Sequence, residues 1–310
     1  MNHFKYLNRA VMIGLALFVS ATCLCAQELK TPPQKSADQT WLSSELKGQK
    51  SYDGMTAVQQ KDVGQFETLL IATLSEIEKP KEEIKIEKLQ DRWASFDWQL
   101  VKSPSGQIFV VREHPDHQHG RGAYAFQTDI KSPIALQAPH RFNDLMTGSI
   151  ATKLFREKAV SAIALNTIHR SEIDLSHTQL HYINAFTSAM IKAHHDVTIL
   201  QIHGFTNEGK TGAAKFTKII VSDSTKFPGR TARQSALELK ATFGADHTRL
   251  FPVDIRQLGG TTNRQAEIAH GLGCPNFLHL ELNREFREEL NADASVRESF
   301  FASLVRGVSK

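Results

Sequence analysis

The second half of this chain alternates short apolar segments with longer segments of helical spacing, and this alternation restricts the fold more than any other feature. Strands are expected at residues 159–165, 197–203, 216–221, 250–253 and 277–282. Helices are expected at residues 144–156, 178–192, 231–243, 263–270 and 293–305. The pattern predicts an α/β fold in which a mixed, mostly parallel sheet carries helices on both faces.

Short strands are predicted in the region before residue 144. They are expected at residues 96–101, 107–112, 123–127 and 134–137, where turn residues separate apolar runs. Upstream, Phe66, Leu69, Leu70 and Ile77 have helical spacing, and the charged segment 78–88 continues or follows that helix. We therefore assign residues 91–310 to one α/β domain.

The first 26 residues have the order of a secretory signal peptide. Lys5 and Arg9 precede an apolar run at residues 10–21, and small residues lie just before Gln27. The run is short for a membrane span, and the residues before Cys23 match a lipoprotein signal poorly. We expect a periplasmic or secreted protein with no stable membrane association after cleavage.

Removal of this segment changes the charge and the cysteine content. Lys5 and Arg9 leave with it, so the net charge falls from +4 to about +2, which does not suggest a nucleic-acid surface. Cys274 remains alone, which excludes an intramolecular disulfide in the mature chain. Residues 27–65 are polar, and we expect residues 27–90 to form a linker and an N-terminal helical arm.

Four side chains near expected strand ends could form a metal site. His140 and Asp144 follow one strand, His203 ends another, and Glu281 lies within an apolar strand. Catalytic zinc takes three ligands from His, Asp and Glu, and a separate carboxylate accepts the proton of its water. His140, Asp144 and His203 are the expected ligands of one Zn²⁺ ion, and Glu281 is the expected base.

Each of these residues also has a structural interpretation. A strand-end histidine is often a hydrogen-bonded packing residue, and Asp144 could be the N-cap of the helix that follows it. Because strand side chains alternate between faces, Glu281 and His279 point the same way and could belong to a solvated face.

The segments 138–144, 166–170 with Asp174, His203-Gly204 and 279–281 together resemble the N-formylglutamate amidohydrolase family and, more distantly, the zinc carboxypeptidases. The similarity spans residues 134–284 and implies a zinc-exopeptidase-like α/β sandwich. By this resemblance His140 and His203 bind zinc and Glu281 is the general base. The carboxypeptidase pattern has Glu three residues after the first His, where this chain has Asn143, with Asp144 one residue further on.

Several residues are candidates for contacts with substrate. Arg170 resembles the arginine that binds the substrate carboxylate in that family, although His169 replaces the preceding Asn, and a structural pair with Asp174 is the alternative. Asn263 and Arg264 end a glycine-rich turn whose N–H groups could bind an anion, or which could be a simple connection. Arg284 is a candidate for stabilising the oxyanion.

Two further motifs have weaker functional interpretations. Residues 204–211 match the P-loop pattern, but a strand is expected too soon afterwards for the helix that such a loop requires. The loop with His114, His117 and His119 could bind metal, but it is more typical of solvated surface histidines.

The sequence as a whole predicts an exported, zinc-dependent hydrolase of an amide bond. Its substrate would be an N-acyl amino acid or a short peptide with a free carboxylate. The alternatives are a non-catalytic periplasmic protein that binds a ligand in the same pocket and, less favoured, a protein that binds nucleotide through Lys210.

Overall fold

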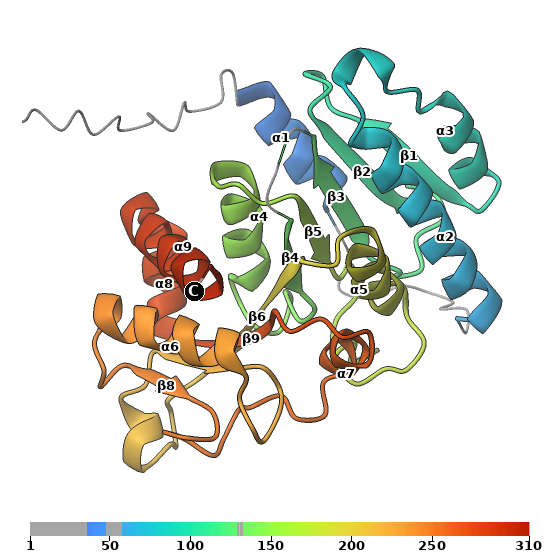
Figure 1. Cartoon of the computed structure of the whole chain (residues 1–310). Helices are drawn as coiled ribbons and strands as arrows, with labels where there is room; N and C mark the ends of the chain where they lie inside the picture. The colour runs from blue at the N-terminus through green and yellow to red at the C-terminus, as the bar shows by residue number, and fades with distance from the viewer. Residues whose placement is uncertain (1–35, 48–57, 129, 131–132, 310) are drawn as a thin grey trace, which may run out of the picture. The chain divides into compact units, whose positions relative to one another are not determined.

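The structure of the chain is a computed structural model that describes residues 36–47, 58–128, 130 and 133–309. The signal peptide expected at residues 1–26 lies outside them. The described residues contain a nine-stranded mixed sheet with strand order β1-β2-β3-β5-β4-β6-β9-β7-β8 (Figure 1). The strands are β1 Trp98–Lys102, β2 Ile108–Glu113, β3 Ala123–Gln127, β4 Ile134–Ala138, β5 Ala162–Leu165, β6 Thr198–Phe205, β7 Ile219–Ser222, β8 Thr248–Leu250 and β9 Phe277–Asn283.

The centre of the sheet is parallel and one side of it is an antiparallel meander. Strands β5, β4, β6 and β9 run in the same direction, whereas β1, β2, β3 and β5 pair in an antiparallel manner. On the other side β7 is antiparallel to β9 and parallel to β8. The parallel centre brings the carboxyl ends of β4, β6 and β9 to one edge, where loops can assemble a site.

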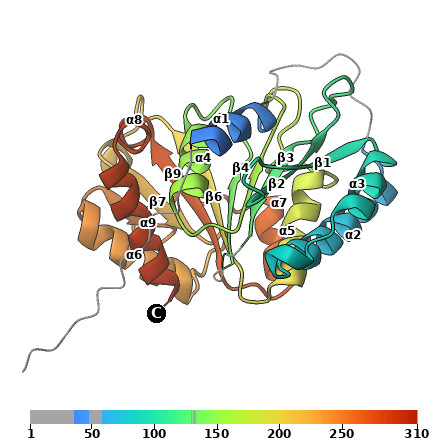
Figure 2. The ribbon, with the colours of Figure 1, turned by 90° about the horizontal axis from the view of Figure 1, so that it is seen from above.

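Helices cover both faces of the sheet, as the alternation predicts (Figure 2). One face packs against α1, α4, α6, α8 and α9, and the other against α2, α3, α5 and α7. The helices are α1 Ser36–Glu45, α2 Gln60–Ile77, α3 Glu87–Ala94, α4 Thr147–Glu157, α5 Tyr182–Ala193, α6 Arg230–Phe243, α7 Arg264–Gly271, α8 Arg284–Ala292 and α9 Ala294–Val308.

The two-residue period of the strands decides which side chains meet these layers. On β6, Leu200 and Ile202 enter the core under α4 and α8, whereas Ile199 enters the core under α5. Gln201 and His203 therefore share the α5 face of the sheet with Ile199. In β9 the same alternation places His279 and Glu281 on that face, so polar side chains collect there at the edge of the apolar core.

The N-terminal helices are part of the core. Phe66 of α2 is fully buried and contacts Trp93 of α3, Trp98 of β1 and Tyr182 of α5, with ring centroids 5.2, 4.8 and 5.1 Å away. Aromatic pairs at these distances are favourable beyond the area they bury. Residues of the expected helical arm thus pack against the expected domain.

Helices α1 and α8 lie where the sequence predicts no helix. Helix α1 lies in a segment expected to be a linker, and its Leu42 is fully buried against the sheet. Helix α8 follows β9 directly, because the side chain of Asn283 caps it by accepting a hydrogen bond from the Phe286 N–H at 2.9 Å. Among the described residues, no helix is long and apolar enough to cross a membrane.

Candidate metal centre

The turn after β4 holds His140 at the edge of the sheet. The amide N–H groups of Asn143 and Asp144 both donate to the His140 carbonyl, at 2.9 and 2.8 Å, which folds the chain back on itself. The buried imidazole hydrogen-bonds through Nε2 to Asp174 Oδ1 at 2.9 Å. Because an ionised carboxylate only accepts, Nε2 carries a proton, and in the neutral imidazole Nδ1 is then left with a lone pair.

His203 lies near the end of β6 and has a matching arrangement. Its Nε2 lies 2.8 Å from Gln201 Oε1, an oxygen that can only accept, so the lone pair is again on Nδ1. The rings of His203 and His140 are in edge contact, with centroids 4.8 Å apart.

Asp144 joins the two histidines. Its Oδ2 lies 3.6 Å from His140 Nδ1 and 3.4 Å from His203 Nδ1, and it accepts a hydrogen bond from the Gly204 N–H at 3.0 Å. The structure does not use Asp144 as a helix cap, since α4 begins at Thr147 with Met146 in the N-cap position. The side chain is instead directed to the histidine pair.

These three residues fit a zinc ion. Their ligand atoms all lie within 4.8 Å of one another, and a tetrahedral ion with bonds of about 2.0–2.1 Å separates its ligands by roughly 3.3 Å. The Nδ1 atom of His140 is buried and has no hydrogen-bond partner among the residues that the structure describes. A buried polar atom of this kind requires a partner, and a cation between the three donors would supply one.

The environment also sets the protonation of the group. Burial alone would raise the pKa of Asp144, but the adjacent imidazoles of His140 and His203 hold that pKa well below its ordinary value. Burial, together with the neighbouring His279, lowers the pKa of His203 to about 4, so this imidazole is neutral at pH 7. For His140, burial acts downward, but the neighbouring carboxylates of Asp144 and Asp174 outweigh it and raise the pKa.

Glu281 lies beside this group on the neighbouring strand. It is paired in register with His203, so both side chains leave the same face. Its Oε1 lies 3.3 Å from Nε2 of His279, whose ring packs against His203 with centroids 4.4 Å apart. Glu281 Oε2 is buried without a hydrogen-bond partner in the described part of the chain, which leaves a carboxylate oxygen available beside the histidines.

The loop after β8 forms the opposite wall of a cavity of about 380 Å³. Ile255 anchors the loop in a small core with Phe205, and Gly260 lies against His279 so closely that a Cβ there would be 2.9 Å from the ring. Arg256 lines the cavity, and its side chain forms no ion pair with any described residue. No motif in the local sequence distinguished Arg256, because packing of distant segments determines the path of this loop.

The predicted substrate residues are placed differently. Arg170 lines the cavity, but its Nε and Nη2 bind Asp174 Oδ2 at 2.9 and 2.8 Å, which is its structural alternative. Asn263 caps α7 through the Ala266 N–H and donates from Nδ2 to Gln201.

Two predicted arginines point elsewhere. Arg264 pairs with Glu267 on α7, and Arg284 is 70% exposed and pairs with Glu288 on α8. Neither lines the cavity with the histidines.

The P-loop-like segment at residues 204–211 is not followed by the α-helix that a phosphate-binding loop requires. A four-residue 3-10 helix, Gly212–Lys215, follows it, so Lys210 and Thr211 do not open an α-helix that could receive phosphates. Gly204 is needed because Arg287 crosses it: a Cβ there would lie 2.2 Å from Arg287 Nη1.

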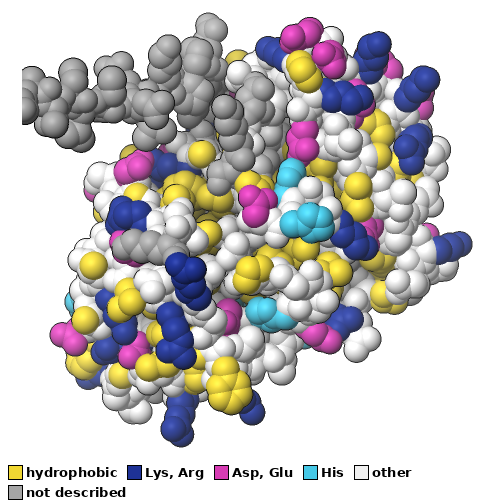
Figure 3. Space-filling model, in the orientation of Figure 1, with side chains coloured by type: hydrophobic (Ala, Val, Ile, Leu, Met, Phe, Trp, Pro, Cys, Tyr) yellow, Lys and Arg dark blue, Asp and Glu magenta, His cyan; other side chains and the backbone are white. Residues whose placement is uncertain are grey.

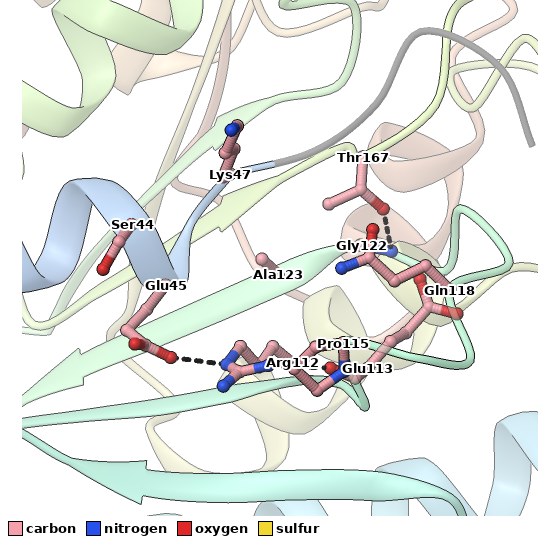
Figure 4. A pocket seen from close by; sticks show the side chains of 10 residues that line it. All are labelled: Ser44, Glu45, Lys47, Arg112, Glu113, Pro115, Gln118, Gly122, Ala123 and Thr167. Carbon is pink, nitrogen blue, oxygen red and sulfur yellow. Dashed lines mark hydrogen bonds and ion pairs between the residues drawn. The ribbon is translucent and has the colours of Figure 1, made fainter.

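A larger cavity, of about 500 Å³, lies beside the histidine-rich loop (Figure 4). Its charged groups are largely engaged with one another. Arg112 donates to Glu45, and the buried Glu113 accepts from the backbone N–H and the Nε of Arg121. His117 of the loop contacts Asp97 at 3.2 Å. In the described residues the metal-type grouping is at His140, Asp144 and His203 and not in this loop.

On the face shown in Figure 3, Lys and Arg side chains are interspersed with Asp and Glu, and histidine side chains reach the surface near its centre. The absence of a nucleic-acid partner stays a prediction.

Comparisons with known proteins do not assign a family. No family model and no curated protein match the sequence. The zinc-free form of a protein called YndL matches with a TM-score of 0.42 and 16% identity, over 63% of this chain and 93% of its own. The gene product Atu2144 of Agrobacterium tumefaciens matches with a TM-score of 0.41 and 14% identity, over 57% of this chain and 92% of its own. A Burkholderia mallei ATCC 23344 protein that was assigned as a carboxypeptidase matches with a TM-score of 0.37 and 11% identity, over 72% of this chain and 67% of its own.

Proposed function

We propose that this protein is an exported, zinc-dependent hydrolase of an amide bond next to a carboxylate. The observation that carries the proposal is the convergence of three buried ligand atoms, His140 Nδ1, His203 Nδ1 and Asp144 Oδ2, beside a glutamate whose Oε2 has no hydrogen-bond partner among the described residues. A hydrolase site of this class requires both parts.

Each residue of the site has a separate role in the proposed reaction. Zinc held by His140, Asp144 and His203 would polarise the amide carbonyl and make water a stronger acid. Glu281 accepts the proton of the attacking water at Oε2 and then donates it to the leaving amine nitrogen, so the residue acts as base and then as acid. Asp174 holds His140 in the tautomer that leaves Nδ1 free for the metal.

Arg256 is the group that we propose binds the substrate carboxylate. It lines the same cavity as His140 and Glu281, and its guanidinium forms no ion pair with an acid in the described part of the chain. Arg170 is already held by Asp174. A free guanidinium can bind a carboxylate through two parallel hydrogen bonds, which favours N-acyl amino acids and short peptides as substrates.

Elemental analysis of the purified mature protein tests the metal site. We expect near-stoichiometric zinc in the wild type and loss of zinc in His140→Ala and His203→Ala, with Arg92→Ala on α3 as a surface control that retains it. Hydrolysis of N-acyl amino acids by the zinc form would then be measured. A wild-type protein that neither contains zinc nor takes up added zinc would refute the proposal.

A binding protein without catalytic activity is the competing hypothesis. It predicts that the same cavity binds the carboxylate ligand while no amide is cleaved. Ligand binding by calorimetry with no product after prolonged incubation of the zinc form would favour this alternative.

A further inference from the structure

Three glutamine side chains are fully buried next to the candidate metal centre. Gln137 lies on β4, Gln201 on β6 and Gln265 on α7, and all three have no exposed surface. An amide is expensive to bury unless its hydrogen bonds are made, and an apolar side chain of the same size would fill the space. These glutamines form a connected chain of hydrogen bonds that ends at His203.

Backbone groups fix the direction of this chain. Asn184 Nδ2 donates to two carbonyl oxygens at the turn before α5, at 2.9 and 2.8 Å, so its Oδ1 must be an acceptor. Gln265 Nε2 donates to that Oδ1 at 2.6 Å and to the Leu175 carbonyl at 2.8 Å. Gln265 Oε1 therefore accepts from Gln201 Nε2 at 3.0 Å. Because carbonyl oxygens cannot donate, reversing one amide would leave two donors or two acceptors facing each other.

Two further anchors lead to the same orientation of Gln201. Thr187 donates to a backbone carbonyl and accepts from Gln137 Nε2 at 2.9 Å, so Gln137 Oε1 faces Gln201 Nε2 at 2.9 Å. Asn263 Oδ1 accepts from the Ala266 N–H, so its Nδ2 donates to Gln201 Oε1. Three independent backbone contacts thus agree that Gln201 presents its oxygen to His203.

We propose that Gln201 is a positioning residue that fixes His203 in the Nε2–H tautomer and so keeps the Nδ1 lone pair directed at the zinc site. The inference rests on the proposed function for the identity of the metal. In the other tautomer, the lone pairs of Nε2 and Gln201 Oε1 would oppose each other, and a proton would occupy the position of the metal at Nδ1. The buried amide chain excludes that tautomer before any metal binds.

Long-range ¹H–¹⁵N spectra of the metal-free mature protein, labelled with ¹⁵N-histidine, test the tautomer directly. The signals of His203 are identified by their absence in His203→Gln. We expect the Nε2–H pattern in the wild type at neutral pH. In Gln201→Met, which has a similar volume and no amide, we expect the Nδ1–H form to appear and the Zn²⁺ affinity to fall about 10- to 100-fold in competition with a chromophoric chelator.

Gln201→Glu separates positioning from simple packing. Its carboxylate still accepts from Nε2–H but cannot donate to Gln137 and Gln265, so it keeps the tautomer and most of the zinc affinity while it lowers the stability. A purely structural role for Gln201 predicts the opposite order, with Glu at least as damaging to zinc binding as Met. Gln127→Met is the matched control, since Gln127 on β3 hydrogen-bonds to backbone carbonyls away from the site.

The Nδ1–H pattern in the wild type would overturn the proposal, as would unchanged tautomer and zinc affinity in Gln201→Met, or equal losses in Met and Glu. The wild-type spectrum decides alone if a variant does not fold. It requires neither zinc nor turnover, so failure of the proposed hydrolase function, seen as absent zinc binding or absent cleavage, is distinguishable from failure of this inference.

Discussion

His203 and Glu281 occupy paired positions on the parallel strands β6 and β9, and both side chains leave the same face of the sheet. This pairing places a metal-ligand candidate directly beside the candidate base, although 78 residues separate them in the sequence. Neither strand end could form the candidate site by itself. The pairing of β6 with β9 brings the two side chains together.

The first prediction concerns the base. Glu281→Gln keeps the shape of the side chain and removes its ability to accept a proton, so we expect turnover to fall at least 100-fold with zinc still bound. Parallel measurement of zinc content and of the rate of amide cleavage checks it. Turnover within a few-fold of the wild type would assign the proton transfer to another group.

The second prediction concerns Arg256. Replacing a charge-assisted contact to a carboxylate costs about 1.5–3 kcal/mol, so Arg256→Ala should raise KM about 10- to 100-fold with a smaller effect on kcat. The same variant should show no such loss with a substrate whose carboxylate is capped as an amide. Arg92→Ala removes an exposed arginine on α3 and serves as the control. An equal loss with both substrates would contradict carboxylate binding by Arg256.

The third prediction concerns stability at acidic pH. Burial lowers the pKa of His181 to about 4, below its ordinary value of 6.5, while its Nδ1 accepts a hydrogen bond from the Ile183 N–H at the start of α5. The unfolded chain therefore binds this proton first, and stability is lost as the pH falls from about 6.5 to 4. In His181→Asn, a neutral capping residue, thermal unfolding should depend less steeply on pH in that window. Parallel curves for the two proteins would contradict this assignment.

The fourth prediction compares two glycines. Gly204→Ala would place a Cβ 2.2 Å from Arg287 Nη1, and overpacking of this kind destabilises by about 1–3 kcal/mol. Gly64 lies inside α2 with no heavy atom within 4 Å of an added Cβ, so Gly64→Ala should stabilise by about 0.5–1 kcal/mol. Urea unfolding of both variants measures the difference. Opposite signs are expected, and two destabilised proteins would show that α2 responds to more than helix propensity.

Much of the fold could be predicted because apolar periodicity is local. The central strands and most helices follow from it, and the three ligand candidates follow from strand ends that carry polar residues. The apolar periodicity does not predict helix α8, because charged residues continue directly from β9, although an Asn at position 283 is a capping signal. That helix turns Arg284 toward solvent, which no spacing argument for the strand could anticipate.

The remaining differences depend on distant contacts. Arg256 reaches the cavity only because Ile255 packs near Phe205, which lies 50 residues earlier in the chain. Asn263 and Gln201 each look like ordinary polar residues in sequence, and their contact arises when α7 docks beside β6. Local sequence patterns cannot predict such contacts, because the packing of whole helices and strands determines them.

The aromatic cluster around Phe66 gives the protein a convenient optical property. The chain has three tryptophans, Trp41, Trp93 and Trp98, and all of them precede residue 100, on α1, α3 and β1. None lines the cavity with His140 and Glu281. Tryptophan fluorescence therefore reports on the docking of the N-terminal helices and not on the metal site. Unfolding of this region can be followed by fluorescence while a chelator reports the loss of metal from the same sample.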